Sequence, residues 1–149
     1  MEKIEKKYLG YLSSYIAGLT HMASSCSKTI GPSYVDADCF SVGNYKEEFA
    51  KAYNISISEI KLVELKESFR EVLIELFGND TYRLIDGLEH WIHMKAGEPV
   101  KLYRIDNECK LPELLSGYNG GNGAFFFMED IYFFEFEKMT ICFMIGNDE

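Results

Sequence analysis

Two histidines are the side chains of this chain best placed to share a metal ion. His90 and His93 stand three residues apart, with Glu89 beside them, in a segment whose apolar spacing predicts a helix. Residues three apart are neighbours on one helix face, so both imidazoles could reach one ion. A catalytic zinc site takes three protein ligands, the HExxH order is absent, and the third histidine, His21, lies in a different predicted helix. We therefore expect neither a metal nor another cofactor.

The candidate nucleophiles lack the neighbours that would activate them. No GxSxG motif marks a serine, and the cysteines are scattered without CxxC spacing, at Cys26, Cys39, Cys109 and Cys142. In a chain without an export signal we expect them to be free thiols. The chain is thus not expected to be an enzyme. A small enzyme with a dispersed site is the alternative, and it would need a deep pocket near His90, His93 or Cys142.

A glycine-rich segment at 117–123, Gly-Tyr-Asn-Gly-Gly-Asn-Gly, invites comparison with phosphate-binding loops. Closely spaced glycines let backbone amides approach an anion. However, no Lys-Ser or Lys-Thr follows the glycines. The segment also leads into a predicted strand, whereas a phosphate site would use a helix N-terminus. We predict a mobile connection, or a tip that becomes ordered when a partner binds.

Residues 48–60 resemble the helix-turn-helix pattern of bacterial regulators, with a small alanine inside a first helix, a turn, and a polar start to a second helix. The second helix would present Ser58, Glu59, Lys61, Glu64 and Lys66, a nearly neutral face without arginine. Because affinity for DNA comes largely from neutralising phosphates, we do not expect direct nucleic-acid binding.

The chain is acidic, and the acidic excess is concentrated towards its end. Its 149 residues contain 24 acids and 15 bases, a net charge of −9. From 111 to 149 there are seven acids and one base, which gives −6. Such a field repels phosphate backbones and attracts basic protein surfaces, although a net charge can also serve solubility alone. A basic protein is therefore the expected partner.

Apolar periodicity predicts helices over much of the first two-thirds of the chain. The predicted helices cover 4–22, 46–53, a segment from Ser58 as N-cap to Gly78 as stop, and 80–97. Residues 24–44 are expected to form a long irregular connection, in which a short strand is equally compatible with the sequence.

The remaining segments change to the two-residue period of strands. A strand is predicted at 100–105, a turn or two of helix at 111–115, and an antiparallel meander at 124–128, 131–137 and 139–145. We predict one α+β domain over 1–149, in which a helical N-terminal two-thirds packs on one face of a C-terminal antiparallel β-meander. No secretory signal and no apolar run of roughly 18 residues is present, so a cytoplasmic protein without a membrane span is expected.

Phenylalanine and tyrosine are dense in the meander, on both predicted faces. Either two layers cover the sheet or one apolar surface awaits a partner. Aromatic and acidic side chains together suit a basic partner, and a second copy at an unpaired sheet edge is a further candidate. The expected contact residues are Glu129, Asp130, Glu135, Glu137, Tyr118 and Tyr132, with Asp36 and Asp38 in the early connection.

The segment 126–136, Phe-Phe-Met-Glu-Asp-Ile-Tyr-Phe-Phe-Glu-Phe, and the ending Ile-Gly-Asn-Asp-Glu resemble the tails of small bacterial toxin-immunity proteins. Members of that class accompany polymorphic or contact-dependent toxins. The resemblance implies a cytoplasmic protein that binds one cognate toxin, often a nuclease, and blocks its active site. An inhibitor of another nucleic-acid enzyme, such as an anti-CRISPR protein, is the alternative within the same physical class.

Overall fold

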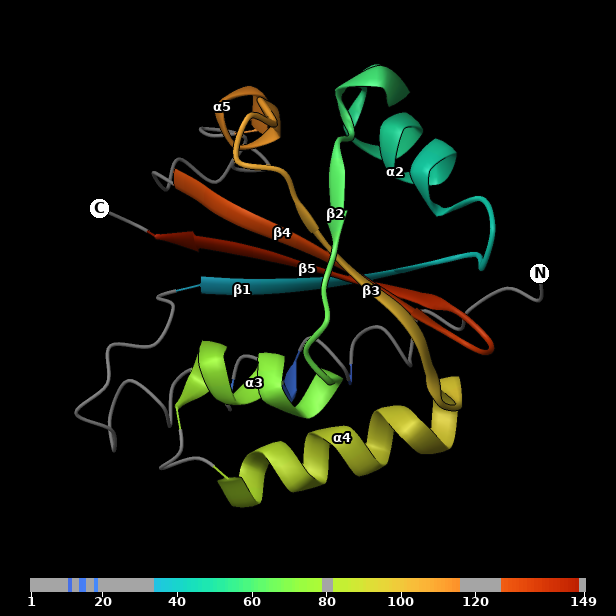
Figure 1. Ribbon diagram of the computed structural model, residues 1–149, viewed down its shortest axis with the longest axis vertical. Coiled ribbons are helices and arrows are strands. Elements are labelled where there is room, and N and C mark those ends of the chain that lie inside the picture. The colour runs from blue at the N-terminus through green and yellow to red at the C-terminus, as the bar shows by residue number, and fades with distance from the viewer. Residues whose placement is uncertain are drawn as a thin grey trace.

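A five-stranded antiparallel sheet forms the centre of the computed structural model (Figure 1). The residues that the structure describes are 11, 14, 15, 18, 34–78, 82–115 and 127–147. The strand order is β1-β5-β4-β3-β2. The strands are β1 (Tyr34–Phe40), β2 (Leu62–Glu64), β3 (Pro99–Ile105), β4 (Phe127–Phe136) and β5 (Thr140–Asn147).

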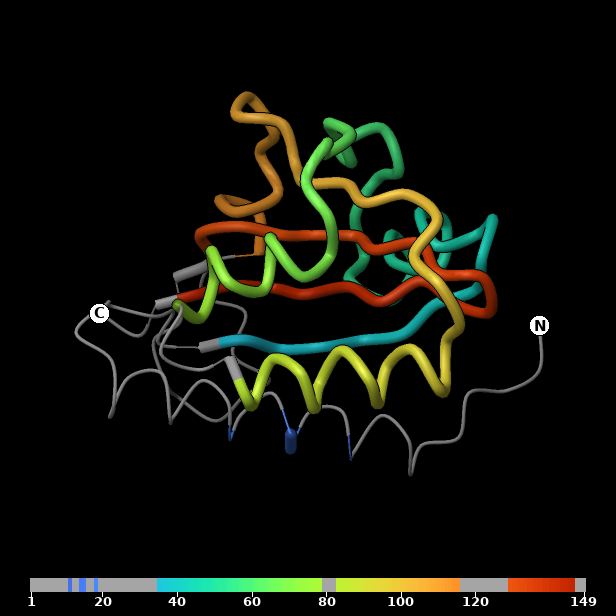
Figure 2. Tube along the Cα trace, turned by 60° about the horizontal axis from the view of Figure 1, so that its bottom comes forward, coloured from blue at the N-terminus to red at the C-terminus, as the bar shows by residue number. Residues whose placement is uncertain are grey.

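Helices cover both faces of this sheet. They are α2 (Tyr45–Tyr53), α3 (Phe69–Phe77), α4 (Tyr82–Ala96) and α5 (Leu111–Leu115), with a 3-10 turn η1 (Ile57–Glu59). Figures 1 and 2 show α3 and α4 on one side of the sheet and α2 and α5 on the other. Two separate apolar clusters follow from this arrangement, one under each helix pair.

The alternation of side chains along β4 explains why both faces are apolar. Phe134 and Phe136 pack into the cluster under α3 and α4, whereas Ile131 and Phe133 pack into the cluster under α2 and α5. All four are at most 1% exposed. Of the two alternatives that the sequence left open, the structure therefore shows the one in which layers cover both faces of the sheet, and not only the one face on which the N-terminal helices were expected.

Several predicted elements are confirmed. The helices at 46–53, 80–97 and 111–115 and the strand at 100–105 appear as α2, α4, α5 and β3, with ends shifted by a few residues at most. On α4, Ile85, Leu88, Ile92 and Ala96 recur at steps of three and four and are fully buried. Of the helix predicted at 4–22, only residues 11, 14, 15 and 18 are described, and all four are helical. The loop at 117–123 lies outside the described residues.

The long helix predicted from Ser58 is wrong. Residues 57–59 form η1 and residues 62–64 form β2, and a new helix, α3, begins after Ser68. The Ser68 Oγ accepts a hydrogen bond from the Glu71 N–H at 3.1 Å, which caps this helix, and Gly78 ends it as predicted. The second helix of the helix-turn-helix pattern is consequently absent from this segment.

The predicted meander and the early connection also differ from the structure. Residues 124–128 and 131–137 were expected as two strands, yet 127–136 form the single strand β4, with a register shift between Met128 and Asp130. The connection at 24–44 contains the short strand that was the alternative, because β1 pairs with β5. The α+β class holds, but the sheet is not confined to the C-terminal third, because β1 lies in the early connection and β2 lies where a helix was expected.

No helix among the described residues is long and apolar enough to cross a membrane.

Candidate functional site

An open groove of about 420 Å³ lies between the N-terminal end of α3, one side of α4 from Asp86 onwards, and the adjoining ends of β3 and β4. Its lining includes the buried aromatic rings of Phe69 and Phe136 together with Pro99. Polar side chains make up much of the rest, and they are Ser68, Arg70, Asp86, Glu89, His90, His93 and Glu98. The groove thus combines an apolar base with a charged rim.

Helical spacing explains why α4 supplies most of the rim. Asp86, Glu89, His90 and His93 follow one another at steps of three, one and three, so they share the side of α4 that faces α3. The buried apolar residues of α4 occupy the neighbouring side of the helix, which packs on the sheet. The two histidines that the sequence singled out are therefore brought to the same groove, with an imidazole exposed to solvent in each case.

The tight turn after α4 places Glu98 on the rim. Gly97 has φ +86°, a conformation that favours glycine, and a Cβ there would lie 2.9 Å from the Glu137 Cβ. The Glu137 Oε1 accepts a hydrogen bond from the Glu98 N–H at 2.7 Å. Glu98 in turn places its Oε1 3.3 Å from the His93 Nδ1.

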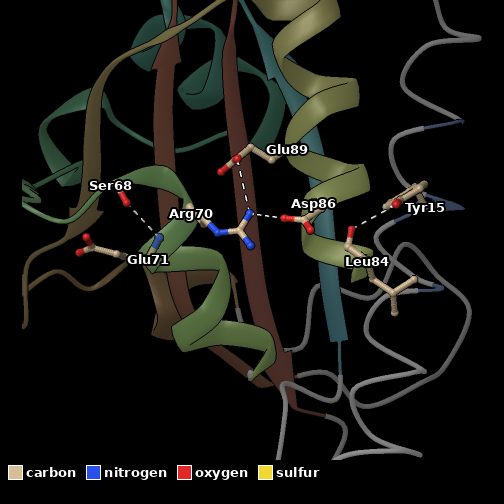
Figure 3. Close-up of polar contacts among 7 residues, drawn as sticks. All are labelled: Tyr15, Ser68, Arg70, Glu71, Leu84, Asp86 and Glu89. Atoms are coloured by element: carbon tan, nitrogen blue, oxygen red, sulfur yellow. Dashed lines mark hydrogen bonds and ion pairs between the residues drawn. The ribbon is translucent and has the colours of Figure 1, made fainter. Parts of the chain in front are cut away.

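The guanidinium of Arg70 is the basic group of the groove lining, and it is already paired. It contacts the Asp86 carboxylate and lies 3.6 Å from the Glu89 carboxylate (Figure 3). The hydrogen bond to Asp86 raises the pKa of Arg70. The groove lining contains three carboxylates, those of Asp86, Glu89 and Glu98, and one guanidinium, so the groove is negative when its histidines are neutral.

The predicted contact residues do not gather into one surface. Glu137 borders the groove, whereas Glu135 belongs to the other face of the sheet and accepts a hydrogen bond from the Tyr45 hydroxyl at 3.0 Å. Asp130 is held 2.6 Å from Arg104. Glu129 is exposed at the register shift of β4. Tyr118 lies outside the described residues.

Tyr132 is unsuited to the contact role that the sequence gave it. It is only 4% exposed and stacks on Phe134, with the Arg104 guanidinium 5.6 Å from its ring centroid. Burial raises the pKa of its hydroxyl to about 12. The expectation failed because alternate residues of β4 point into the cluster under α3 and α4.

Asp36 and Asp38 lie on β1, on the side of the sheet that carries α2 and α5. Their carboxylates accept hydrogen bonds from the backbone N–H of the next residue, Ala37 at 3.2 Å and Cys39 at 3.0 Å. Burial raises the pKa of the Asp38 carboxyl. These two residues are therefore half-buried parts of a strand and not the tips of a contact loop.

The described cysteines are poor nucleophiles. Cys39, Cys109 and Cys142 are buried free thiols. Burial raises the pKa of Cys39 to about 12 and that of Cys142 well above its usual value, so neither forms a thiolate readily. Within the described part of the chain, no group of three histidine, cysteine or carboxylate side chains is arranged to hold a metal ion.

Three of the groove residues were expected from the sequence to lie together. Sequence reasoning singled out His90, His93 and Glu89 from their spacing, but it missed Arg70 and Glu98. Arg70 reaches the groove only because α3 packs against α4, which the local sequence does not show, whereas Glu98 follows α4 directly and is returned to it by the turn at Gly97. Comparisons with family models, with curated proteins and with solved structures found no match to this chain.

Proposed function

We propose that this chain is a small acidic binding protein that neutralises a cognate protein partner in the cytoplasm. Its simplest form is an immunity protein that blocks a toxin nuclease, in line with the resemblance of its C-terminal segment. The observation that carries the proposal is the groove between α3 and α4, with an apolar base and more carboxylates than bases.

A long basic side chain matches this groove chemically. The methylene stem of a lysine or arginine packs on apolar surface such as Phe69 and Pro99, while its charged head reaches carboxylates such as Glu89 and Glu98. The Glu89 carboxylate is 3.6 Å from Arg70, longer than a good hydrogen bond, so it retains capacity for a second cation. Nuclease substrate clefts are basic, so an acidic protein can occupy them in place of nucleic acid.

The experiment is capture of a partner followed by reconstitution. The tagged chain is used to recover proteins from its native host at low and high salt, and the recovered partner is then purified and assayed with and without the chain. We expect one stoichiometric basic protein, lost as salt rises, whose activity on nucleic acid the chain inhibits. A partner that acts on nucleic acid without being a toxin would support the alternative of an anti-CRISPR type of inhibitor.

Charge reversal in the groove tests whether the groove carries the binding. Glu89→Lys with Glu98→Lys should weaken affinity on the order of tenfold or more and reduce its salt dependence, because two attractive charges become repulsive. The matched control is Glu108→Lys with Glu113→Lys, exposed carboxylates outside the groove lining. Equal effects of the two double variants would mean that only net charge matters and that the groove is not the contact.

The pairing of His93 with Glu98 supports a second candidate, the small enzyme. A carboxylate at the His93 Nδ1 can orient the ring so that Nε2 serves as a general base at the groove. The purified chain would then hydrolyse some ester, amide or phosphoester in a substrate panel. Turnover abolished by His93→Gln with unchanged partner affinity would favour the enzyme over the binding protein.

A further inference from the structure

The two edges of the sheet differ in what they offer to another chain. At β1, the Asp36 and Asp38 carboxylates already accept hydrogen bonds from the N–H groups of Ala37 and Cys39. Val35, Ala37 and Cys39 of that strand are at most 9% exposed. The β2 edge is more open, since Lys61, Val63 and Glu64 are all exposed there.

Two hydrogen bonds fix how the β2 backbone is oriented. Leu65 N–H donates to Leu102 C=O at 2.8 Å, and Asp106 N–H donates to Lys61 C=O at 2.8 Å. Residues 61, 63 and 65 therefore direct their backbone groups towards β3. In an antiparallel ladder the intervening residues point the other way. Leu62 and Glu64 thus direct their N–H and C=O groups away from the sheet.

The side chains along this edge are locally balanced in charge. Lys61 and Lys66 are offset by Glu64 and Glu67, and Glu64 lies 3.7 Å from Lys101 on β3. The β2 edge therefore does not share the negative net charge of the whole chain. A basic strand from another protein would gain no special advantage here.

We propose that β2 pairs antiparallel with β2 of a second copy of this chain, about a two-fold axis through Val63. In this register the outward N–H and C=O of Leu62 meet those of Glu64 of the second copy, and the reverse pair is formed by symmetry. Four backbone hydrogen bonds then join the two five-stranded sheets into a single ten-stranded sheet. This proposal does not depend on the function proposed above.

The same register brings together suitable side chains. Val63, whose exposed fraction is 47%, stands opposite its own copy, and β-branched residues pair well across strands. Lys61 stands opposite Leu65, and Ile60 opposite Lys66, so no two like charges face each other over 60–66. Pairing at β1 about Ala37 would instead set Asp36 opposite Asp38, which like-charge repulsion disfavours.

The test is the oligomeric state of the full chain, measured by sedimentation and light scattering over a range of protein concentrations. We expect a concentration-dependent dimer. Val63→Lys and Val63→Glu should each weaken dimerisation on the order of tenfold, since each places two like charges across the two-fold axis. An equal mixture of the two variants should regain the dimer, because opposite charges then face each other.

Two further variants separate this edge from other surfaces. Val100→Lys changes a valine of β3 that is 60% exposed and should leave the dimer unchanged. Glu64→Pro removes an outward N–H without removing a bond to β3, so it should yield a folded monomer by circular dichroism. A chain that is monomeric at every concentration, a dimer that survives both Val63 variants, or a mixture that stays monomeric would each overturn the proposal. Partner capture is measured separately, so the two proposals can fail independently.

Discussion

Replacement of Gly87 by alanine should destabilise the natural chain, which has tyrosine at residue 15. The same replacement should stabilise a chain that has phenylalanine there. Gly87 lies in the middle of α4, and a Cβ there would overlap the Tyr15 hydroxyl. That hydroxyl donates to the Leu84 carbonyl at 3.1 Å (Figure 3), and the Tyr15 ring stacks on Trp91 with centroids 6.0 Å apart. A gain in helix propensity therefore competes with loss of the Tyr15 contacts.

The opposing contributions can be estimated from these contacts. Glycine to alanine inside a helix favours folding by about 1 kcal/mol. Displacing Tyr15 loses a hydrogen bond of about 1 kcal/mol and a stacked aromatic pair of about 1 kcal/mol. Gly87→Ala should thus destabilise the natural chain by about 1 kcal/mol.

Tyr15→Phe is the matched background for this substitution. It removes the overlapping hydroxyl, and the next ring atom, Cζ, is 3.5 Å from the built Cβ, an ordinary contact. Tyr15→Phe alone should cost about 1 kcal/mol, and Gly87→Ala should then restore about 1 kcal/mol. The two changes should therefore be coupled by about 2 kcal/mol in favour of the double variant.

Urea denaturation of the four proteins, followed by circular dichroism, measures this coupling. Trp91 is the sole tryptophan, so its emission should report loss of the Tyr15 stack in Gly87→Ala alone. The contrary result is that Gly87→Ala raises the free energy of unfolding equally in the natural chain and in Tyr15→Phe. That result would show that Tyr15 does not pack over Gly87.

Three further outcomes are expected. Ser68→Ala removes the acceptor for the Glu71 N–H and should lower the free energy of unfolding by about 1 kcal/mol in urea, whereas Ser68→Asp should stay close to the natural chain. Because burial raises the pKa of Cys142, its alkylation, followed by peptide mass spectrometry, should be no faster than unfolding; labelling at the rate of a free peptide thiol would contradict this. Burial also raises the pKa of Asp38, so the stability that its neutral form contributes is present below the unfolded pKa of about 3.9 and is lost as the pH rises through the folded pKa. Asp38→Asn keeps an acceptor for the Cys39 N–H, so it should be more stable than the natural chain at neutral pH and not at about pH 3; an advantage that grows in acid would contradict the sign.

The segment from Ser58 to Phe77 shows why periodicity alone failed. Apolar residues of β2 and of α3 happen to continue one helix-like series, and both Ser58 and Ser68 resemble an N-cap. The residue three positions after each serine distinguishes the two candidates. A capping box has a glutamate there, as Glu71 follows Ser68, whereas Lys61 follows Ser58. The start of α3 was therefore predictable from the sequence.

The strand β1 shows a different reason for failure. Val35, Ala37 and Cys39 alternate with Asp36 and Asp38, which is the period of a strand with one buried face. The acidic residues suggested a solvated contact segment instead. Their carboxylates are half-buried because α2 packs on the same face, a tertiary contact that the local sequence does not encode.

Acidic residues that are close in sequence do not make an acidic surface when the chain is a strand. Asp130 and Glu135 sit in one strand, yet one pairs with Arg104 and the other receives the Tyr45 hydroxyl on the opposite face. Arg104 offsets the charge of Asp130, whereas Glu135 keeps its charge but presents it on the other face of the sheet, so the two carboxylates do not add up to one acidic surface. The groove carboxylates come from α4 and from the turn after it, where helix spacing gathers side chains on one side. Reversal of Glu89 and Glu98 is for this reason the sharper test of the binding function than reversal of the acids in β4.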